Sequence, residues 1–243
     1  MKQEWKIMKI TLLTGKIFDI QKELDMDIKI IQSRSLNKLT LHIDNKERLP
    51  VLSLPKFCTR KKAIKFVNEN MDWIIENLKK LPEIKYFSDG LKIMIFGENL
   101  QISHQPQARC GVRKDNKTLI VSGGEEFIHR RVKDYIKKRA ESEFYLLSSQ
   151  MAKKIGYKLN SICIKDTKSR WGSCSSLNNI NYSWRIALAP KFVINYLMAH
   201  EVAHLKHQNH SPEFWNCVEY LYPEWKKGHN WLKENGKSLY SYK

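Results

Sequence analysis

The chain has 243 residues, of which 42% are hydrophobic and 28% charged, as is typical of a folded protein with one or two domains. Its formal net charge of +18 would attract polyanions such as nucleic acid or nucleotides, although scattered Lys residues also give basic surfaces without a specific partner. The five cysteines form no CxxC pair, which argues against a disulfide framework and against a cysteine-based zinc site.

Residues 1–20 are charged throughout, and their longest apolar stretch, Ile10 to Leu13, is too short for a signal peptide. No segment approaches the roughly 20 apolar residues that span a bilayer. We therefore expect a soluble, cytoplasmic protein without a membrane partner.

Residues 1–124 are predicted to form a β-rich region with one helix. Alternation of apolar and polar residues, punctuated by Gly and Pro, indicates strands. A spacing of three and four between apolar residues predicts the helix, which Pro82 would end. The expected strands are 39–44, 49–54, 91–96, 100–104 and 118–121, and the expected helix is 60–81.

Residues 125–243 carry a different pattern, beginning with a long predicted helix over 125–155 that Gly156 is placed to cap. Strands are expected at 162–164, 170–175 and 180–188, followed by helices to the C-terminus. The predicted fold class is α+β, with a domain boundary near 122–125 and a small, mostly antiparallel sheet in the second domain.

Four of the eight histidines lie between His200 and His210. His200 and His204 are separated by one helical turn, so both imidazoles can reach one metal ion. Glu201 would then face the open position of a zinc ion and activate a zinc-bound water as general base. The segment His200-Glu201-Val202-Ala203-His204 therefore predicts a zinc-dependent hydrolase, most simply a peptidase with one ion.

A third ligand must come from beyond the helix. His207 would lie about 10 Å along the axis from His200 on a continuing helix, which is too far to share a metal. His210 can reach back if the helix ends after His204 and Asn209 adopts a left-handed turn, with Ser211-Pro212 starting the next helix. The alternatives are a downstream carboxylate or another histidine: Glu213, Glu219, Glu224 and His229.

Several motifs together resemble the YgjP-like (DUF45) metallopeptidase family over residues 30 to 235. They are Arg170-Trp171-Gly172-Ser173-Cys174-Ser175, Trp184-Arg185, Ala189-Pro190, the HExxH segment, and His210-Ser211-Pro212-Glu213-Phe214-Trp215. The resemblance implies a zincin-like catalytic domain with His200, His204 and His210 as ligands. It also implies a likeness to the SprT and WLM peptidases, some of which act on DNA-bound proteins. His207 stands where metzincins have Gly, so the chain is not expected to be a metzincin.

The segment 170–175 is a candidate strand for pairing with a polypeptide substrate, through Arg170, Trp171, Gly172, Ser173 and Cys174. Alternatively, Trp171 packs beneath the metal helix. The candidates for a second-shell or oxyanion-stabilising role are His207, Tyr182, Arg185 and Arg170.

Two other functions are compatible with the sequence. A metal-dependent hydrolase of nucleotide phosphoanhydrides would use the basic charge, although no GxxxxGK[ST] loop is present. A nucleic-acid-associated module with a structural metal would need four protein ligands, whereas three histidines leave one position open.

Overall fold

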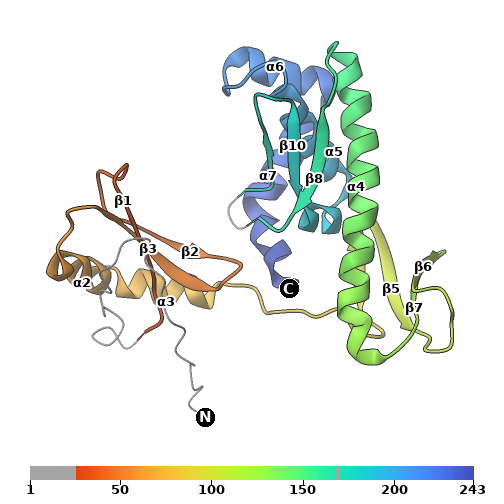
Figure 1. The fold of residues 1–243 in the computed structure, drawn as a ribbon, viewed down its shortest axis with the longest axis horizontal. Coiled ribbons are helices and arrows are strands. Elements are labelled where there is room, and N and C mark those ends of the chain that lie inside the picture. The colour runs from red at the N-terminus through yellow and green to blue at the C-terminus, as the bar shows by residue number, and fades with distance from the viewer. Residues whose placement is uncertain (1–25, 168–169) are drawn as a thin grey trace. The chain divides into compact units, whose positions relative to one another are not determined.

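The computed structural model describes residues 26–167 and 170–243, so the charged segment 1–20 lies outside the described residues. The chain divides into two compact units, one ending at Pro82 and one spanning Glu83–Lys243 (Figure 1). The boundary expected near residues 122–125 is therefore wrong. Strands between residues 92 and 121 share a hydrophobic core with the following long helix, and this common core joins them to the second unit.

The first unit is a three-stranded sheet packed against two helices. The strands β1 (Lys29–Ser33), β2 (Thr40–Asp44) and β3 (Leu49–Pro55) have the order β1-β3-β2. β3 runs parallel to β1 and antiparallel to β2. The predicted helix 60–81 is divided into α2 (Arg60–Glu69) and α3 (Met71–Lys79), because Asn70 leaves the helical conformation and donates its side-chain amide to the Phe66 carbonyl.

The second unit begins with a four-stranded sheet in the order β4-β5-β7-β6. Its strands are β4 (Lys92–Ile95), β5 (Glu98–His104), β6 (Val112–Asp115) and β7 (Thr118–Val121). A short 3-10 turn, η1 (Glu125–Phe127), leads into α4 (Ile128–Lys154). The long helix is confirmed: its buried residues recur every three or four positions, and Gly156 follows it with φ of 77°.

A second sheet combines β8 (Ser161–Lys165), β9 (Gly172–Cys174) and β10 (Asn179–Ser183) in the order β8-β10-β9. The sheet is mixed and not mostly antiparallel, because β9 and β10 form a hairpin whose second strand runs parallel to β8. The strand expected over 180–188 ends at Ser183, where the chain enters the 3-10 segment η2 (Trp184–Leu188). There the Ala187 carbonyl accepts a hydrogen bond from the Phe96 amide at 2.6 Å.

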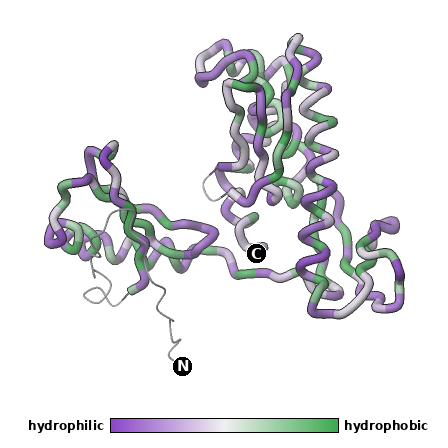
Figure 2. The backbone as a smooth tube through the Cα atoms, viewed as in Figure 1, coloured by the Kyte–Doolittle hydropathy of each residue, from purple (hydrophilic) through white to green (hydrophobic). Residues whose placement is uncertain are grey.

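The C-terminal helices are α5 (Lys191–Ala203), α6 (Pro212–Leu221) and α7 (Trp225–Asn235), followed by η3 (Gly236–Ser241). Helix α5 is the central element, because it contacts α4, α6, α7 and β9 and is buried on most of its surface. In α4, by contrast, hydrophilic and hydrophobic residues alternate along the helix (Figure 2). The predicted α+β fold class is confirmed. Within the described ranges, every helix is too short or too polar to cross a bilayer.

Candidate metal centre

Helix α5 carries the first two histidines at its C-terminal end. His200 lies in its last turn and His204 is the C-cap, still in the right-handed helical region with φ of −66° and ψ of −16°. One helical turn therefore separates the two rings, whose centroids are 5.1 Å apart. Both side chains are half-buried, because α6 packs against this end of α5.

The chain then turns and brings His210 back to the same place. Nε2 of His210 lies 3.2 Å from Nε2 of His200. Asn209 is not among the described residues with positive φ, so the expected left-handed turn at this position is wrong. The helix instead ends in tight turns in which the amides of Leu205 and Lys206 donate to the carbonyls three residues earlier. Ser211 is the extended N-cap of α6 and Pro212 its first residue, as predicted.

The three imidazoles fit the requirements of one metal ion. Each of His200, His204 and His210 offers one ring nitrogen, and these atoms all lie within 4.8 Å of one another. Two nitrogens bound to the same tetrahedral zinc at about 2.0–2.1 Å would be about 3.3 Å apart, close to the observed 3.2 Å. Nδ1 of His204 must donate to the His207 carbonyl at 3.0 Å, which leaves its Nε2 unprotonated and free to bind metal.

Burial favours the neutral form of His200 and His204, which is the form that metals bind. It lowers the pKa of His200 to about 3, with further lowering by the positive charges of His204, His210 and His229. The pKa of His204 is also lowered, mainly by burial. Nδ1 of His200 is buried without a hydrogen-bond partner in the described part of the chain.

Phe214 forms the floor of the cluster. Its ring is fully buried, and its centroid lies 5.0, 4.5 and 4.7 Å from those of His200, His204 and His210. Because α6 follows directly after His210, the same short segment supplies both the third imidazole and the ring that supports all three.

Glu201 is a buried carboxylate next to this cluster, with 4% of its surface exposed. Burial raises its pKa to about 8, and the positive charge of Arg170 opposes this effect. Gly172 of β9 lies directly against it: a β-carbon at residue 172 would be 2.6 Å from Cγ and Cδ of Glu201. The same carboxylate acts on Cys174, whose pKa is raised to about 11 by burial and then by the charge of Glu201.

β9 is an edge strand of its sheet, and its faces alternate as expected. Gly172 and Cys174 face α5 and Glu201, whereas Trp171 packs against Tyr240 with ring centroids 4.8 Å apart. Ser173 accepts a hydrogen bond from the side-chain amide of Asn181 at 3.3 Å. Arg170, just before the strand, is exposed and accepts a hydrogen bond from Thr167 at its carbonyl.

His207 contributes to the site through its backbone carbonyl, which accepts from His204, and its imidazole is not part of the cluster. Among the described residues, the cluster also leaves out the alternative ligands that the sequence offered. These are Glu213, Glu219, Glu224 and His229.

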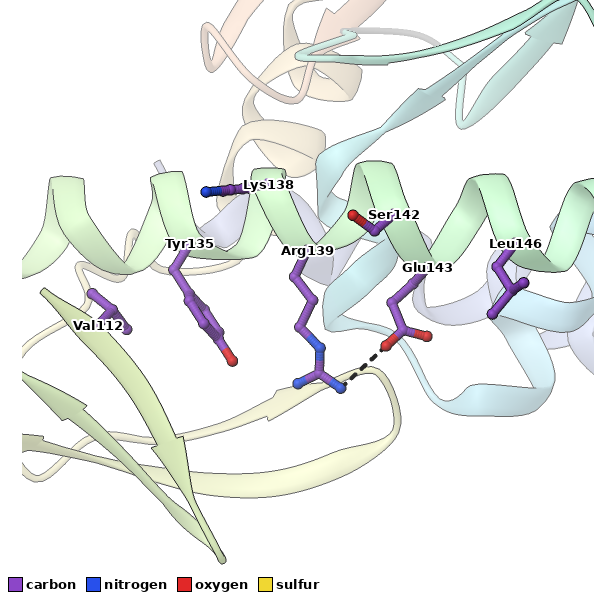
Figure 3. Close-up of a pocket in the computed structure, with 7 residues that line it drawn as sticks. All are labelled: Val112, Tyr135, Lys138, Arg139, Ser142, Glu143 and Leu146. Carbon is purple, nitrogen blue, oxygen red and sulfur yellow. Dashed lines mark hydrogen bonds and ion pairs between the residues drawn. The ribbon is translucent and has the colours of Figure 1, made fainter. Parts of the chain in front are cut away.

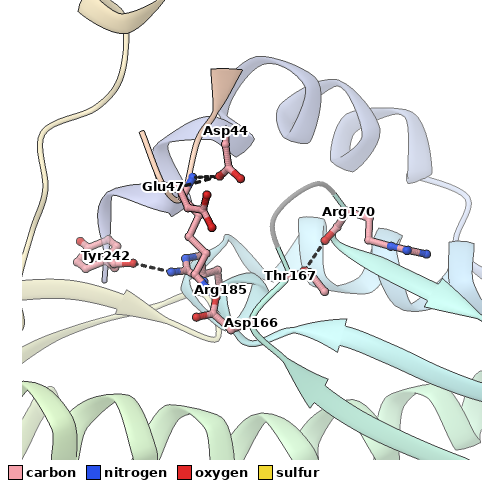
Figure 4. A network of polar contacts seen from close by, with 8 residues as sticks. Asp44, Glu47, Asp166, Thr167, Arg170, Arg185 and Tyr242 are labelled. Atoms are coloured by element: carbon pink, nitrogen blue, oxygen red, sulfur yellow. Dashed lines mark hydrogen bonds and ion pairs between the residues drawn. The ribbon is translucent and has the colours of Figure 1, made fainter. Parts of the chain in front are cut away.

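Tyr182 and Arg185 are both buried away from solvent. The Tyr182 hydroxyl hydrogen-bonds the Ser148 hydroxyl at 2.9 Å, and burial raises its pKa well above the usual value. Arg185 is 1% exposed and forms an ion pair with Asp166, while its second Nη donates to the Tyr242 carbonyl at 3.0 Å (Figure 4). The structure therefore places Arg185, one of the candidates for an oxyanion-stabilising role, in a buried network with Asp166 and the Tyr242 carbonyl.

Tyr196 and His229 were not identified from the sequence as partners. The Tyr196 hydroxyl and Nδ1 of His229 are 2.9 Å apart, and the Tyr196 ring packs edge-on against His200 at 5.8 Å between centroids. In the sequence, Gly228 is the residue that could have indicated this contact, because a glycine lets two helices approach closely. A β-carbon at residue 228 would be 2.9 Å from Tyr196 Cγ, so only glycine allows α7 to approach α5 here.

A pocket between α4 and β6 contains none of the residues predicted for the site (Figure 3). Tyr135, Arg139 and Glu143 point into it from α4, and Arg139 donates to Glu143 at 3.4 Å. Its full lining is Val112, Tyr135, Lys138, Arg139, Ser142, Glu143 and Leu146.

Comparison with known proteins identifies the family. The model of the YgjP-like metallopeptidase domain matches residues 37–235, whereas no curated protein matches the chain. Among solved structures, the metallopeptidase zymogen of Pyrococcus abyssi abylysin is similar, with 22% identity and a TM-score of 0.35. The likeness covers 38% of this chain and 95% of that one. Because the family model spans most of the sequence, the chain belongs to the YgjP-like family and is a metallopeptidase.

Proposed function

We propose that this protein is a zinc-dependent peptidase, with one ion bound by His200, His204 and His210 and with Glu201 as general base. The observation that carries the proposal is the convergence of three ring nitrogens, which lie within 4.8 Å of one another. They lie beside the buried carboxylate of Glu201, which directly follows His200 in α5. Imidazole ligands suit zinc, and three protein ligands leave a position open for chemistry.

When bound, zinc would supply Lewis acidity that activates water and polarises the scissile carbonyl. The carboxylate of Glu201 accepts the proton of the attacking water and later delivers it to the leaving amine. Gly172 holds this carboxylate in place from one side, and Arg170 favours its charged, proton-accepting form.

A polypeptide is the substrate that these surroundings fit best. No described strand pairs with the outer edge of β9. This edge can therefore accept an extended chain by main-chain hydrogen bonds. The five free thiols favour a reducing compartment such as the cytoplasm. A nucleic acid partner rests on the net charge of +18 alone and is not part of the proposal.

The test is a comparison of the wild type with Glu201→Gln on casein, a DNA-crosslinked protein and nucleotides, with the zinc content of each protein measured. Both proteins should hold about one zinc, and only the wild type should cut polypeptide. Glu219→Gln, at an exposed carboxylate of α6, is the matched control and should be fully active. Release of phosphate from nucleotides without cleavage of polypeptide would overturn the peptidase proposal, and full activity of Glu201→Gln would overturn the role of this carboxylate.

A further inference from the structure

The contact between Tyr196 and His229 defines which nitrogen of His229 carries the proton. Tyr196 is 5% exposed, and its hydroxyl has no other hydrogen-bond partner in the described residues than Nδ1 of His229. If Nδ1 were the donor, the hydroxyl proton would be buried without an acceptor, at a cost of about 1–3 kcal/mol. Tyr196 therefore donates to Nδ1, which leaves Nε2 as the ring nitrogen of His229 that carries a proton.

The His229 ring lies near the histidine cluster. His200 and His229 contact the same two rings: Tyr196, at 5.8 and 5.7 Å between centroids, and Trp215, at 5.8 and 5.9 Å. His229 also contributes to the lowering of the His200 pKa, which requires proximity. Nε2 of His229 has no partner among the described residues, and the side chain is half-exposed, so this nitrogen is available to a ligand.

The packing of the two helices makes this arrangement rigid. Gly228 brings the α7 backbone against Tyr196, and the stacked rings of Trp215 and Trp225, 4.6 Å apart, flank His229 at 5.9 and 6.0 Å. A hydrogen-bond donor held in this way needs little reorganisation when charge develops nearby.

We infer that His229 is a catalytic hydrogen-bond donor whose Nε2–H stabilises the oxyanion formed from the scissile carbonyl, and that Tyr196 is its positioning residue. The inference rests on the proposed peptidase function and assigns the oxyanion-stabilising role within it. Donation of a hydrogen bond by this N–H requires no transfer of its proton.

The test uses the zinc-loaded full chain with fluorescein-labelled casein and the variants His229→Ala, His229→Gln, Tyr196→Phe and Glu201→Gln. Lys227→Met is the matched control, because Lys227 joins α7 to α5 through the Phe192 ring at 4.7 Å without touching the histidines. Removal of an oxyanion donor typically lowers kcat about 100- to 1000-fold, so His229→Ala should show this loss with an unchanged KM and one zinc. Its Tm should fall somewhat, because the buried Tyr196 hydroxyl loses its partner.

His229→Gln should recover part of the loss, because its amide N–H can occupy the place of Nε2–H. Tyr196→Phe should lower kcat by a smaller factor of about 10, as loss of an orienting partner does. A readout independent of activity is the 15N NMR spectrum of the imidazole: His229 should be the Nε2–H tautomer in the wild type and lose this preference in Tyr196→Phe.

The outcomes separate the two proposals. If Glu201→Gln is inactive while His229→Ala keeps kcat within about threefold of the wild type, the inference alone is overturned. Loss of zinc together with equal losses of kcat in His229→Ala and His229→Gln would also overturn it, since these results indicate a purely structural role. If the wild type and Glu201→Gln cut casein equally, the proposed function fails and the inference fails with it.

Discussion

Replacement of Gly172 by Ala tests the coupling between β9 and the proposed general base. The added β-carbon would lie 2.6 Å from Cγ and Cδ of Glu201, whereas ordinary contacts begin at 3.4 Å, so the side chain must move by about 0.8 Å. Gly172 does not have a positive φ, so Ala is compatible with the backbone. The perturbation therefore acts on the carboxylate and not on the strand.

The expected result is a large loss of activity with a small loss of stability. A displacement of about 1 Å in a reacting group can lower the rate about 100-fold, and overpacking of this size destabilises by about 1–3 kcal/mol. At about 2–4 °C for each kcal/mol in a chain of this length, the Tm should fall by roughly 2–12 °C.

The assay is the kcat for casein hydrolysis, measured together with zinc content and Tm. Ser173→Ala is the control, because residue 173 faces the opposite side of the same strand. A Gly172→Ala variant with one zinc and a kcat near that of the wild type would refute the coupling, and so would an equal loss of kcat in Ser173→Ala.

Three further predictions concern the packing around the site and the bound zinc. Phe214→Ala should destabilise the protein by about 3–5 kcal/mol and weaken zinc binding, because the buried ring of Phe214 contacts all three histidines. Denaturant unfolding measures the first effect and zinc titration the second. An unchanged zinc affinity would show that this ring does not support the histidines. Asp166→Ala should lower the free energy of unfolding by about 3–5 kcal/mol, because the buried guanidinium of Arg185 loses its ion-pair partner. The zinc content and kcat of the folded protein should stay unchanged; a selective loss of kcat would indicate that Arg185 takes part in the reaction. Removal of zinc by a chelator should lower the Tm by about 10 °C when free zinc is about 1000 times Kd, a stabilisation of about 4 kcal/mol; a variant with His200 and His204 both changed to Ala should show no such shift in differential scanning fluorimetry.

The parts of the site that depend on local spacing could be predicted from the sequence. His200 and His204 are one helical turn apart, and Ser211-Pro212 marks the start of α6, so the return of His210 followed from the need to end one helix and begin another. The turn itself was predicted incorrectly: it is made by backbone hydrogen bonds after Ala203 and not by a left-handed Asn209.

The parts that depend on packing between distant segments could not be predicted. Tyr196 and His229 are 33 residues apart and meet only because α7 approaches α5 at Gly228. Arg185 is next to Trp184 in one of the motifs that carry the family resemblance, yet its partners, Asp166 and the Tyr242 carbonyl, come from remote segments. The boundary near residue 124 was misplaced for the same reason, because the core that joins β4–β7 to α4 is a tertiary feature.

The most direct measurement of the central claim is anomalous diffraction at the zinc absorption edge from crystals of the wild-type protein. We predict one zinc peak, about 2.0–2.1 Å from a ring nitrogen of each of His200, His204 and His210, with no fourth protein ligand. A peak outside this cluster, or a fourth side chain that closes the coordination sphere, would contradict the proposed metal centre.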